Sequence, residues 1–377
     1  MGAPAGAAAD DEAWMARALA LAGRARGLTS PNPMVGALVV RDGVCVGEGF
    51  HRRAGAAHAE VEALGAAGER ARGATLYVTL EPCNHAGRTP PCTPAVLSSG
   101  VARVVIATND PNPRVPGGGA DILRAAGLAV TVGCLAAEAR AVNEPFFTAM
   151  LCRRPHVTLK CAMTLDGKIA GADGRARWIT GPAARREAHR MRAQSDAVVV
   201  GIGTALVDDP ALDVRLDAPW PREPLRVVVD SFARLPANAR LIGAGDPARA
   251  VIAVTEAAPA ERVAALVARG ATLLRCRARD GRVDVVDLLA HLLAADVIAV
   301  LLEGGAVLNG AFVDAGVVDR AAFFVAPIIL GGSTAPGAVA GLGRTLPDAF
   351  RLEALAARPV GPDWLLEGAV DRSGGSV

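Results

Sequence analysis

The sequence predicts two consecutive α/β domains. Short apolar runs typical of buried strands alternate with helix-length amphipathic stretches along the whole chain. The 377 residues exceed one ordinary hydrophobic core, and 51% of them are apolar. The alternation is interrupted at Leu151-Cys-Arg-Arg-Pro-His156 and restarts there with a new strand. We therefore expect a flexible tail at 1–10, one domain at 11–150 and another at 151–377.

The first domain begins with an alanine-rich stretch that favours helix, followed by valine-rich runs that favour strands. The same two patterns then recur, separated by glycines and prolines that end each element. We expect helices over 11–26, 58–68, 93–99, 120–126 and 135–150, and strands over 35–40, 44–49, 75–79, 103–107 and 129–132.

The second domain shows the same alternation with a long glycine-rich loop after its first strand. We expect strands at 156–161, 197–201, 226–229, 250–254, 272–275, 297–302, 321–325 and 364–366, and helices near 182–193, 259–269, 284–294 and 305–315.

Composition excludes several classes of protein. The net charge is +2 with scattered basic residues, and aromatic residues make up 3%, so neither a basic patch nor a stacking surface for nucleic acid is present. No signal peptide or membrane-spanning run is visible. Seven cysteines without framework spacing indicate reduced thiols, so we expect a cytoplasmic protein.

The chemistry of the first domain is concentrated in two short segments. His58-Ala-Glu60 is followed by Pro82-Cys83 and, after eight intervening residues, by Cys92. One imidazole and two thiolates can bind Zn²⁺ with an open fourth position, as in catalytic sites. A nearby glutamate that is not a ligand can then move protons, as in zinc-dependent base deaminases. A closed zinc knuckle with His85 as fourth ligand is the alternative, although it has no need of Glu60.

These residues resemble the deaminase half of the bifunctional deaminase/reductase family of riboflavin biosynthesis. The resemblance rests on the eight-residue spacer, which nucleoside and tRNA deaminases lack, and on the following motifs: His58-Ala-Glu60, Leu80-Glu-Pro-Cys83-Asn-His85, Gly87-Arg-Thr-Pro-Pro-Cys92, Pro31-Asn-Pro-Met-Val-Gly36, Gly49-Phe-His51 and Asp110-Pro-Asn-Pro113.

The resemblance implies a cytidine-deaminase-like three-layer fold and a phosphorylated diaminopyrimidinone substrate. Zinc, bound by His58, Cys83 and Cys92, would activate water, and Glu60 would pass the proton to departing ammonia. Asn32 and His51 would contact the pyrimidine. The spacer residues His85 and Arg88 would reach the ribose phosphate.

The second domain carries weaker motifs when taken alone. Val198-Val-Val-Gly-Ile-Gly-Thr204 lacks the third glycine of a dinucleotide fingerprint, while Leu301-Leu-Glu-Gly-Gly305 can form a phosphate-binding turn or a turn without a ligand. These segments nevertheless resemble the reductase half of the same family, as do the following: Lys160-Cys-Ala-Met-Thr-Leu-Asp-Gly167, Trp178-Ile-Thr180, Arg192-Ala-Gln-Ser195, Asp208-Asp-Pro-Ala-Leu212, Arg215 and Asp230-Ser231.

The second resemblance implies a dihydrofolate-reductase-like fold that uses NADPH to reduce the ribosyl group to ribityl. Lys160 is our candidate for polarising the ring-opened sugar. The residues implied at the cofactor are Met163, Trp178, Thr204, Asp208, Ser231, Gly305, Ala306, Val307, Leu308, Asn309, Gly310 and Ala311. Those implied at the substrate are Ala176, Arg192, Leu212, Arg215 and Glu303. The family usually has Gly-Glu-Ser where this chain has Gly174-Arg-Ala176, so a serine hydroxyl is missing.

The sequence therefore predicts a bifunctional riboflavin-biosynthesis enzyme that binds a small phosphorylated pyrimidine, zinc and NADPH, with no nucleic-acid or membrane partner. We also expect a homo-oligomer. Two rivals stay open at this point. A nucleic-acid base deaminase predicts a two-residue cysteine spacer, and a chain with one working half would keep the other as a structural module.

Overall fold

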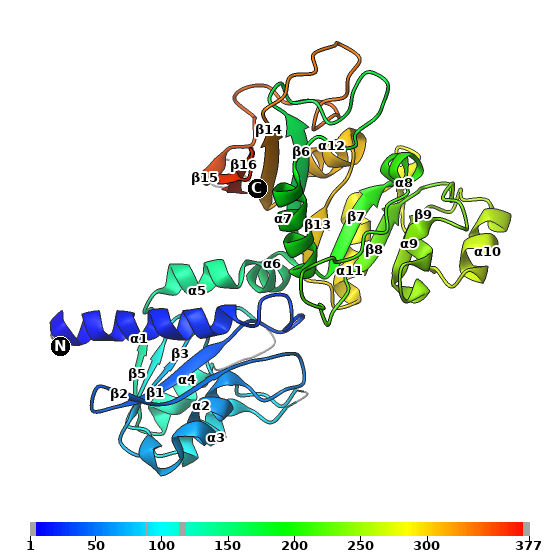
Figure 1. Cartoon of the computed structure of the whole chain (residues 1–377). Helices are drawn as coiled ribbons and strands as arrows, with labels where there is room; N and C mark the ends of the chain where they lie inside the picture. The colour runs from blue at the N-terminus through cyan, green and yellow to red at the C-terminus, as the bar shows by residue number, and fades with distance from the viewer. Residues whose placement is uncertain (1–4, 88, 113–117, 372–377) are drawn as a thin grey trace. The chain divides into compact units, whose positions relative to one another are not determined.

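The computed structural model describes residues 5–87, 89–112 and 118–371 (Figure 1). Contacts between residues divide the chain into two compact units, Met1–Arg153 and Arg154–Val377, which are described separately here. No helix in the described part is long and apolar enough to cross a membrane.

Unit 1 is built on a five-stranded sheet in the order β2-β1-β3-β4-β5. β1 is antiparallel to β2 and β3, whereas β3, β4 and β5 are parallel to one another. Helices cover both faces, which gives three layers (Figure 1). The strands are β1 (Gly36–Arg41), β2 (Val44–Phe50), β3 (Thr75–Val78), β4 (Arg103–Ile106) and β5 (Ala129–Val132).

One face of this sheet packs against α1 (Ala5–Gly23) and α5 (Ala136–Val142) through a core that includes Met15, Leu38 and Ala139. α1 begins at Ala5, six residues before the expected start of the first helix at residue 11, and it ends at Gly23. The other helices are α2 (Ala59–Ala67), the short η1 (Gly68–Ala71), α3 (Cys92–Ser98), α4 (Gly119–Ala125) and α6 (Glu144–Cys152).

The single helix expected over 135–150 is wrong, because the chain breaks at Asn143 into α5 and α6. The Asn143 side chain accepts a hydrogen bond from the Met34 backbone N–H (2.8 Å) and donates one to the Met34 carbonyl (2.9 Å). Pro145 also has no N–H to donate to a helix that continued from α5. These two hydrogen bonds attach the N-terminus of α6 to the loop that precedes β1.

Unit 2 contains a nine-stranded sheet in the order β10-β9-β8-β7-β13-β6-β14-β16-β15. The strands from β10 to β14 in this order are parallel, and the last two are antiparallel. The sheet strands are β6 (His156–Thr164), β7 (Ala197–Gly201), β8 (Leu225–Val229), β9 (Ala250–Val254), β10 (Thr272–Arg275), β13 (Ala299–Leu302), β14 (Arg320–Ala326), β15 (Leu352–Val360) and β16 (Asp363–Val370).

The parallel strands are rich in valine and leucine because both faces of the sheet are covered, and these side chains form the core of the unit. The helices are α7 (Pro182–Ala193), α8 (Ile202–Asp208), α9 (Arg240–Gly243), η2 (Pro247–Arg249), α10 (Ala260–Ala268), α11 (Val285–Ala294) and α12 (Ala306–Asp314), with a small hairpin of β11 (Ala278–Arg279) and β12 (Arg282–Val283).

Several elements of unit 2 differ from the sequence prediction, among them α9, η2, β11 and β12, where no helix or strand was expected. β6 continues to Thr164, three residues beyond its expected end, because it pairs with β14 as far as Ala326. Helix α8 directly follows β7 and was not expected. β15 was also missed, because its alanine-rich and mostly exposed residues lack the alternation of a half-buried strand.

The strand order of unit 2 brings together the ends of β6, β7 and β13. The chain passes from β6 to β7 and later inserts β13 between them. Crevices that bind ligands form beyond the carboxyl ends of parallel strands where the order switches in this way. Glu303 and Gly305 directly follow β13 and therefore lie at this edge.

Candidate active sites

Two of the three predicted metal ligands of unit 1 lie at the N-terminal ends of helices, and the third lies in a turn. His58 is the N-cap residue of α2, and Cys92 is the first residue of α3. Cys83 follows β3 in the turn that leads to α3, and its carbonyl accepts the backbone N–H of Cys92. The turn therefore brings the two cysteines together despite the long spacer.

The ligand atoms of His58, Cys83 and Cys92 all lie within 4.8 Å of one another. His58 Nδ1 is 3.1 Å from Cys92 Sγ and 3.5 Å from Cys83 Sγ. Its Nε2 lies 3.0 Å from the Thr89 hydroxyl, which can hold the ring in one orientation. This donor set fits a tetrahedral zinc ion that keeps one position for a water molecule or substrate. Among the described residues, His85 is not part of this cluster.

The electrostatics of the cluster favour a cation. The hydrogen bond from Cys92, together with His58, lowers the pKa of the Cys83 thiol to about 4. Cys83 in turn raises the pKa of His58. A thiolate and an imidazole that share a proton are donors that a divalent metal can bind in place of that proton.

Glu60 is buried beside the cluster, with 3% of its surface exposed. Burial raises the pKa of its carboxyl group to about 7, and the negative charge of Cys83 adds to this effect. A carboxyl group with a pKa near neutrality can both accept and release a proton at physiological pH. Glu60 therefore has the properties of a general acid and base.

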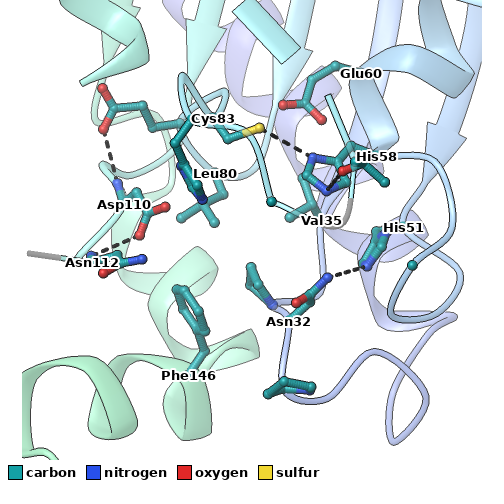
Figure 2. Close-up of a pocket in the computed structure, with 17 residues that line it drawn as sticks. Asn32, Val35, His51, His58, Glu60, Leu80, Cys83, Asp110, Asn112 and Phe146 are labelled. Atoms are coloured by element: carbon teal, nitrogen blue, oxygen red, sulfur yellow. Dashed lines mark hydrogen bonds between the residues drawn. The ribbon is translucent and has the colours of Figure 1, made fainter. Parts of the chain in front are cut away.

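His58, Cys83 and Glu60 form one end of a pocket of about 250 Å³ (Figure 2). Asn32 and Phe146 lie at the other end. His51 is buried, and its Nδ1 donates to the Ala57 carbonyl, so its Nε2 can accept from Asn32 Nδ2 at 3.1 Å. Burial lowers the pKa of His51, which favours this neutral form. The predicted residues Asn32, His51 and His85 all line the pocket, whereas Arg88 and Pro113 lie outside the described residues.

Other residues of the pocket were not singled out from the sequence. The Glu81 carboxylate accepts the backbone N–H groups of Asp110 (3.1 Å) and Ala120 (2.9 Å). Glu81 thus holds the segment after β4 against the cysteine turn. Glu81 could have been predicted as a site residue, because it directly precedes Pro82 and Cys83 in the motif. Phe146 could not, because it lies on α6 outside every motif.

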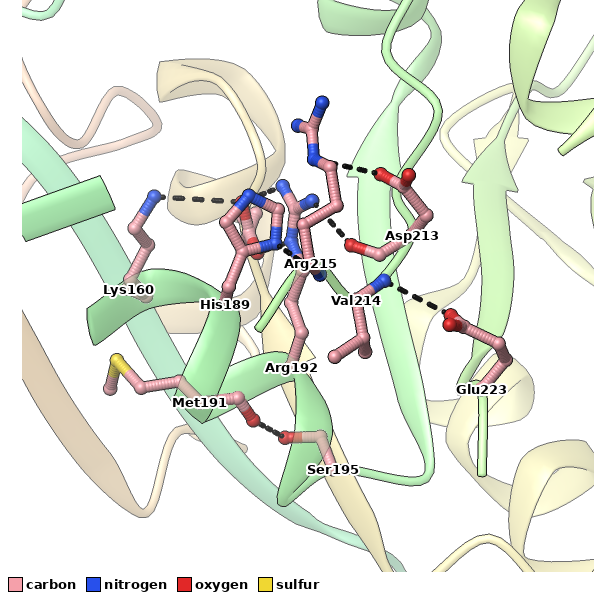
Figure 3. A network of polar contacts seen from close by, with 10 residues as sticks. Lys160, His189, Met191, Arg192, Ser195, Asp213, Val214, Arg215 and Glu223 are labelled. Carbon is pink, nitrogen blue, oxygen red and sulfur yellow. Dashed lines mark hydrogen bonds and ion pairs between the residues drawn. The ribbon is translucent and has the colours of Figure 1, made fainter. Parts of the chain in front are cut away.

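A network of charged side chains lies in unit 2 (Figure 3). The Arg192 guanidinium donates to both carboxylate oxygens of Glu303, at 2.6 and 2.9 Å, and Lys160 Nζ lies 3.5 Å from the same carboxylate. Burial favours the protonated acid, but Arg192 and Lys160 together lower the pKa of Glu303 well below its usual range. Lys160 lies within β6 rather than at its end, and it reaches Glu303 because β13 already ends at Leu302.

The other predicted substrate residues of unit 2 occupy different environments. The Arg215 side chain is 62% exposed, and its nearest acid is Asp213 at 3.6 Å. Leu212 is 2% exposed and packs in the core, so its side chain has little surface to offer a ligand. Ala176 lies in the loop before α7 and is half-buried.

Most predicted cofactor residues follow the ends of β6, β7 and β13 in the chain, whereas Ser231 follows β8. Trp178 is 67% exposed, with the guanidinium of Arg185 4.5 Å from its ring centre. Asp208 pairs with Arg177 at 3.5 Å. A side chain at Gly305 would come within 3.1 Å of the Thr204 hydroxyl, so this glycine keeps the first turn of α12 open. An open helix N-terminus of this kind can hold a phosphate group of a dinucleotide.

Not all predicted cofactor residues are equally accessible. Met163 is the next-to-last residue of β6. On and before α12, some residues keep exposed surface: Gly305, Ala306, Val307 and Ala311. The residues between them are buried: Leu308, Asn309 and Gly310. Asn309 donates to the Ala338 carbonyl, and the Ser231 hydroxyl accepts the Val283 N–H. The buried residues therefore support the site from behind, whereas the exposed ones can contact a ligand.

Comparison with known proteins matches each unit to a family. Residues 8–108 match the model of the cytidine and deoxycytidylate deaminase zinc-binding region, and residues 155–366 match the RibD C-terminal domain. The riboflavin biosynthesis protein RibD of Aquifex aeolicus is 44% identical over 85% of this chain and 88% of its own length. That of Escherichia coli K12 is 43% identical over 94% of this chain and 98% of its own length.

Solved structures agree with these matches. Acinetobacter baumannii RibD has a TM-score of 0.87 and 38% identity, covering 97% of this chain and 100% of that one. A diaminohydroxyphosphoribosylaminopyrimidine deaminase/5-amino-6-(5-phosphoribosylamino)uracil reductase from Thermotoga maritima has a TM-score of 0.83 and 35% identity, with the same coverage. The predicted fold class, zinc-binding deaminase and reductase are thereby confirmed. The chain belongs to the RibD family, the bifunctional deaminase/reductase enzymes of riboflavin biosynthesis.

Proposed function

We propose that this protein deaminates 2,5-diamino-6-(5-phosphoribosylamino)pyrimidin-4-one and then reduces the ribosyl group of the product to ribityl with NADPH. The first reaction is assigned to residues 11–150 and the second to 151–377. The name of the Thermotoga maritima relative, which carries both activities, supports this assignment.

One observation carries the first half of the proposal: the donor atoms of His58, Cys83 and Cys92 lie within 4.8 Å of one another beside the buried carboxyl group of Glu60. A zinc ion bound there supplies a Lewis acid that makes water nucleophilic at neutral pH. Glu60 accepts a proton from the attacking water and returns it to the exocyclic amine, which leaves as ammonia.

The remaining pocket residues orient the substrate. Asn32 and His51, which are hydrogen-bonded to each other, present one amide and one imidazole face to the pyrimidine ring. His85 and Arg88 are assigned to the phosphate end, where cationic or donor groups match its charge. The eight-residue spacer between Cys83 and Cys92, in place of the two-residue spacer of nucleic-acid base deaminases, supports a free phosphorylated pyrimidine as the substrate.

In the second half, bound NADPH supplies the reducing equivalents to the former anomeric carbon. Lys160 polarises the sugar oxygen, and Glu303 and Arg192 hold Lys160 in place. Arg215 binds the substrate phosphate, with Ala176 and the backbone of Leu212 beside it. The cofactor contacts are assigned to Met163, Trp178, Thr204, Asp208, Ser231 and Gly305–Ala311, of which Leu308–Gly310 act through their support of the helix.

We further propose that the enzyme is cytoplasmic and homo-oligomeric, and that it has no nucleic-acid or membrane partner. The odd number of cysteines and their lack of framework spacing support a reducing compartment.

Two assays on the full chain test the proposed function. Ammonia release is measured with the diaminopyrimidinone and zinc, and NADPH oxidation is measured with the deaminated product. Glu60→Gln should abolish ammonia release, by at least a hundredfold, and leave NADPH oxidation intact. Glu62→Gln, two residues further along α2 and paired with Arg52, is the matched control and should retain both activities. Ammonia release that survives Glu60→Gln would refute the mechanism.

A further inference from the structure

The segment that carries Arg215 has no regular secondary structure, yet three side chains hold its backbone. It lies between α8, which ends at Asp208, and β8, which begins at Leu225. The Asp213 carbonyl accepts from Arg192 at 3.1 Å, and the Val214 N–H donates to Glu223 at 3.0 Å. The Arg215 N–H donates to Nδ1 of His189 at 3.2 Å (Figure 3).

His189 lies one helical turn before Arg192 on α7, so both side chains project from the same face of the helix. Arg192 is committed to Glu303 and to the Asp213 carbonyl, and His189 is committed to the next-but-one residue of the same segment. The helix thus holds the segment at two points. The Arg215 guanidinium remains exposed and available to an anion.

We propose that His189 is a positioning residue of the reductase site, and that its unprotonated Nδ1 fixes the backbone of Arg215 so that the guanidinium meets the phosphate of the substrate. The inference rests on the proposed reductase function. His189 does not itself touch the reacting atoms, and its effect is exerted on substrate affinity rather than on the chemical step.

The charged groups around His189 come from several elements. They are Arg192 on α7, Arg215 and Asp213 on the connecting segment, and Glu303 after β13. Burial, followed by the two arginines, lowers the pKa of His189 from its ordinary value of 6.5, although Glu303 and Asp213 oppose the shift. The ring is therefore neutral at pH 7 and can accept a hydrogen bond. A protonated ring has no lone pair at Nδ1, so the contact is lost when the pH falls below this lowered pKa.

The first test compares His189→Leu with His189→Asn in the full-length, zinc-loaded protein. Leucine removes the acceptor, whereas the asparagine Oδ1 occupies the position of Nδ1 and does not titrate. At pH 7.5 we expect His189→Leu to raise the KM for the phosphorylated substrate about tenfold, with kcat and the KM for NADPH within about twofold of wild type. His189→Asn should restore the KM to within about threefold. His291→Leu, a partly exposed histidine on α11, is the matched control.

A double-mutant cycle tests whether His189 affects the KM through Arg215. If His189 acts through Arg215, then His189→Leu should raise the KM no further once Arg215 has been changed to Met. The pH profile gives an independent readout. As the pH falls below the lowered pKa of His189, the KM of the wild type should rise more steeply than that of His189→Asn, whereas protonation of the substrate phosphate affects both proteins equally.

The outcomes separate the inference from the proposed function. A wild-type chain that cannot oxidise NADPH with the deaminated product overturns both. Wild-type turnover combined with an unchanged KM in His189→Leu, or with additive effects of the two substitutions, overturns the role of His189 alone. If His189→Leu also loses ammonia release, the variant is misfolded and its KM is not informative. The KM of His189→Asn then decides: a folded His189→Asn protein whose KM is still raised about tenfold counts against the proposal.

Discussion

Arg192 and Glu303 form a bidentate ion pair in which two guanidinium nitrogens donate to two carboxylate oxygens. The third guanidinium nitrogen donates to the Asp213 carbonyl. The sequence predicts that Arg192 holds the substrate, and one N–H on each of its two terminal nitrogens remains for that role. Its contacts with the protein fix Glu303, which lies 3.5 Å from Lys160 Nζ.

Replacement of Lys160 tests the catalytic role of this network. Lys160→Met removes the ammonium group that polarises the sugar oxygen and leaves Glu303 paired with Arg192. We expect reductase kcat to fall by a factor of about 10²–10⁴, the usual range for loss of a proton-transferring or polarising group. NADPH oxidation measures the effect, and unchanged ammonia release in the same sample shows that the protein is folded. A kcat within a few-fold of wild type would contradict the assignment.

Replacement of one cysteine ligand should remove the zinc ion without affecting the reductase. Cys92→Ser should remove zinc and ammonia release together, since serine is a poor ligand for this ion. Cys152→Ser changes an exposed thiol outside the cluster and serves as the control. Zinc content by mass spectrometry should be about one per chain in the control and near zero in Cys92→Ser, while NADPH oxidation persists in both. Full zinc content in Cys92→Ser would show that the ligand set is different.

Replacement of Thr89 should weaken zinc binding at the same site without abolishing it. Its hydroxyl lies 3.0 Å from the ring nitrogen of His58 that does not face the cysteines. Thr89→Val should weaken zinc binding about 10- to 100-fold, as is usual when the outer partner of a metal-bound histidine is removed. Competition with a chromophoric chelator measures this affinity. Ser98→Ala on α3 is the control, and equal zinc affinity in the two variants would argue against an orienting role.

The buried pair of Arg154 and Asp319 predicts a pH-dependent contribution to stability. Arg154 donates to both Asp319 oxygens at 2.6 and 2.7 Å. Although burial opposes it, the hydrogen bonds from Arg154 lower the pKa of Asp319. The stabilisation is therefore present above the unfolded-state pKa of an aspartate, about 3.9, and is lost as the pH falls through the lower folded value.

Asp319→Asn should accordingly destabilise unit 2 by about 3 kcal/mol at pH 7, because a buried guanidinium loses its counter-charge. The difference from wild type should shrink below about pH 4. Urea unfolding followed by fluorescence at several pH values measures it. Glu256→Gln, from an exposed pair with Arg275, should cost less than about 1 kcal/mol, and an equal cost for both variants would contradict the prediction.

The zinc ligands could be predicted from the sequence because their residue types and order determine the chemistry. His58, Cys83 and Cys92 come together as expected, with Cys92 opening α3. Most strands of the two sheets were also predictable, because buried strands are continuous apolar runs. Strand β15 was not, since its stability comes from pairing with β16 rather than from burial of its own side chains.

The positions of single side chains were the least predictable. Leu212 matched a family motif, but its side chain points into the core. His189 was not singled out, because its partner is a backbone N–H of a distant segment without periodicity. Asn143 likewise read as an ordinary helix residue, and only its contact with Met34 accounts for the break between α5 and α6.

That contact has a consequence for the selectivity of the deaminase. The amide of Asn143 bonds to the backbone beside Pro31–Pro33 and opens the helix that carries Phe146. Phe146 and the Pro31–Pro33 loop both line the pocket, so the Asn143 amide joins two segments of the pocket wall. We therefore expect a change at Asn143 to alter the width of the pocket, although Asn143 is not among the described residues that line it.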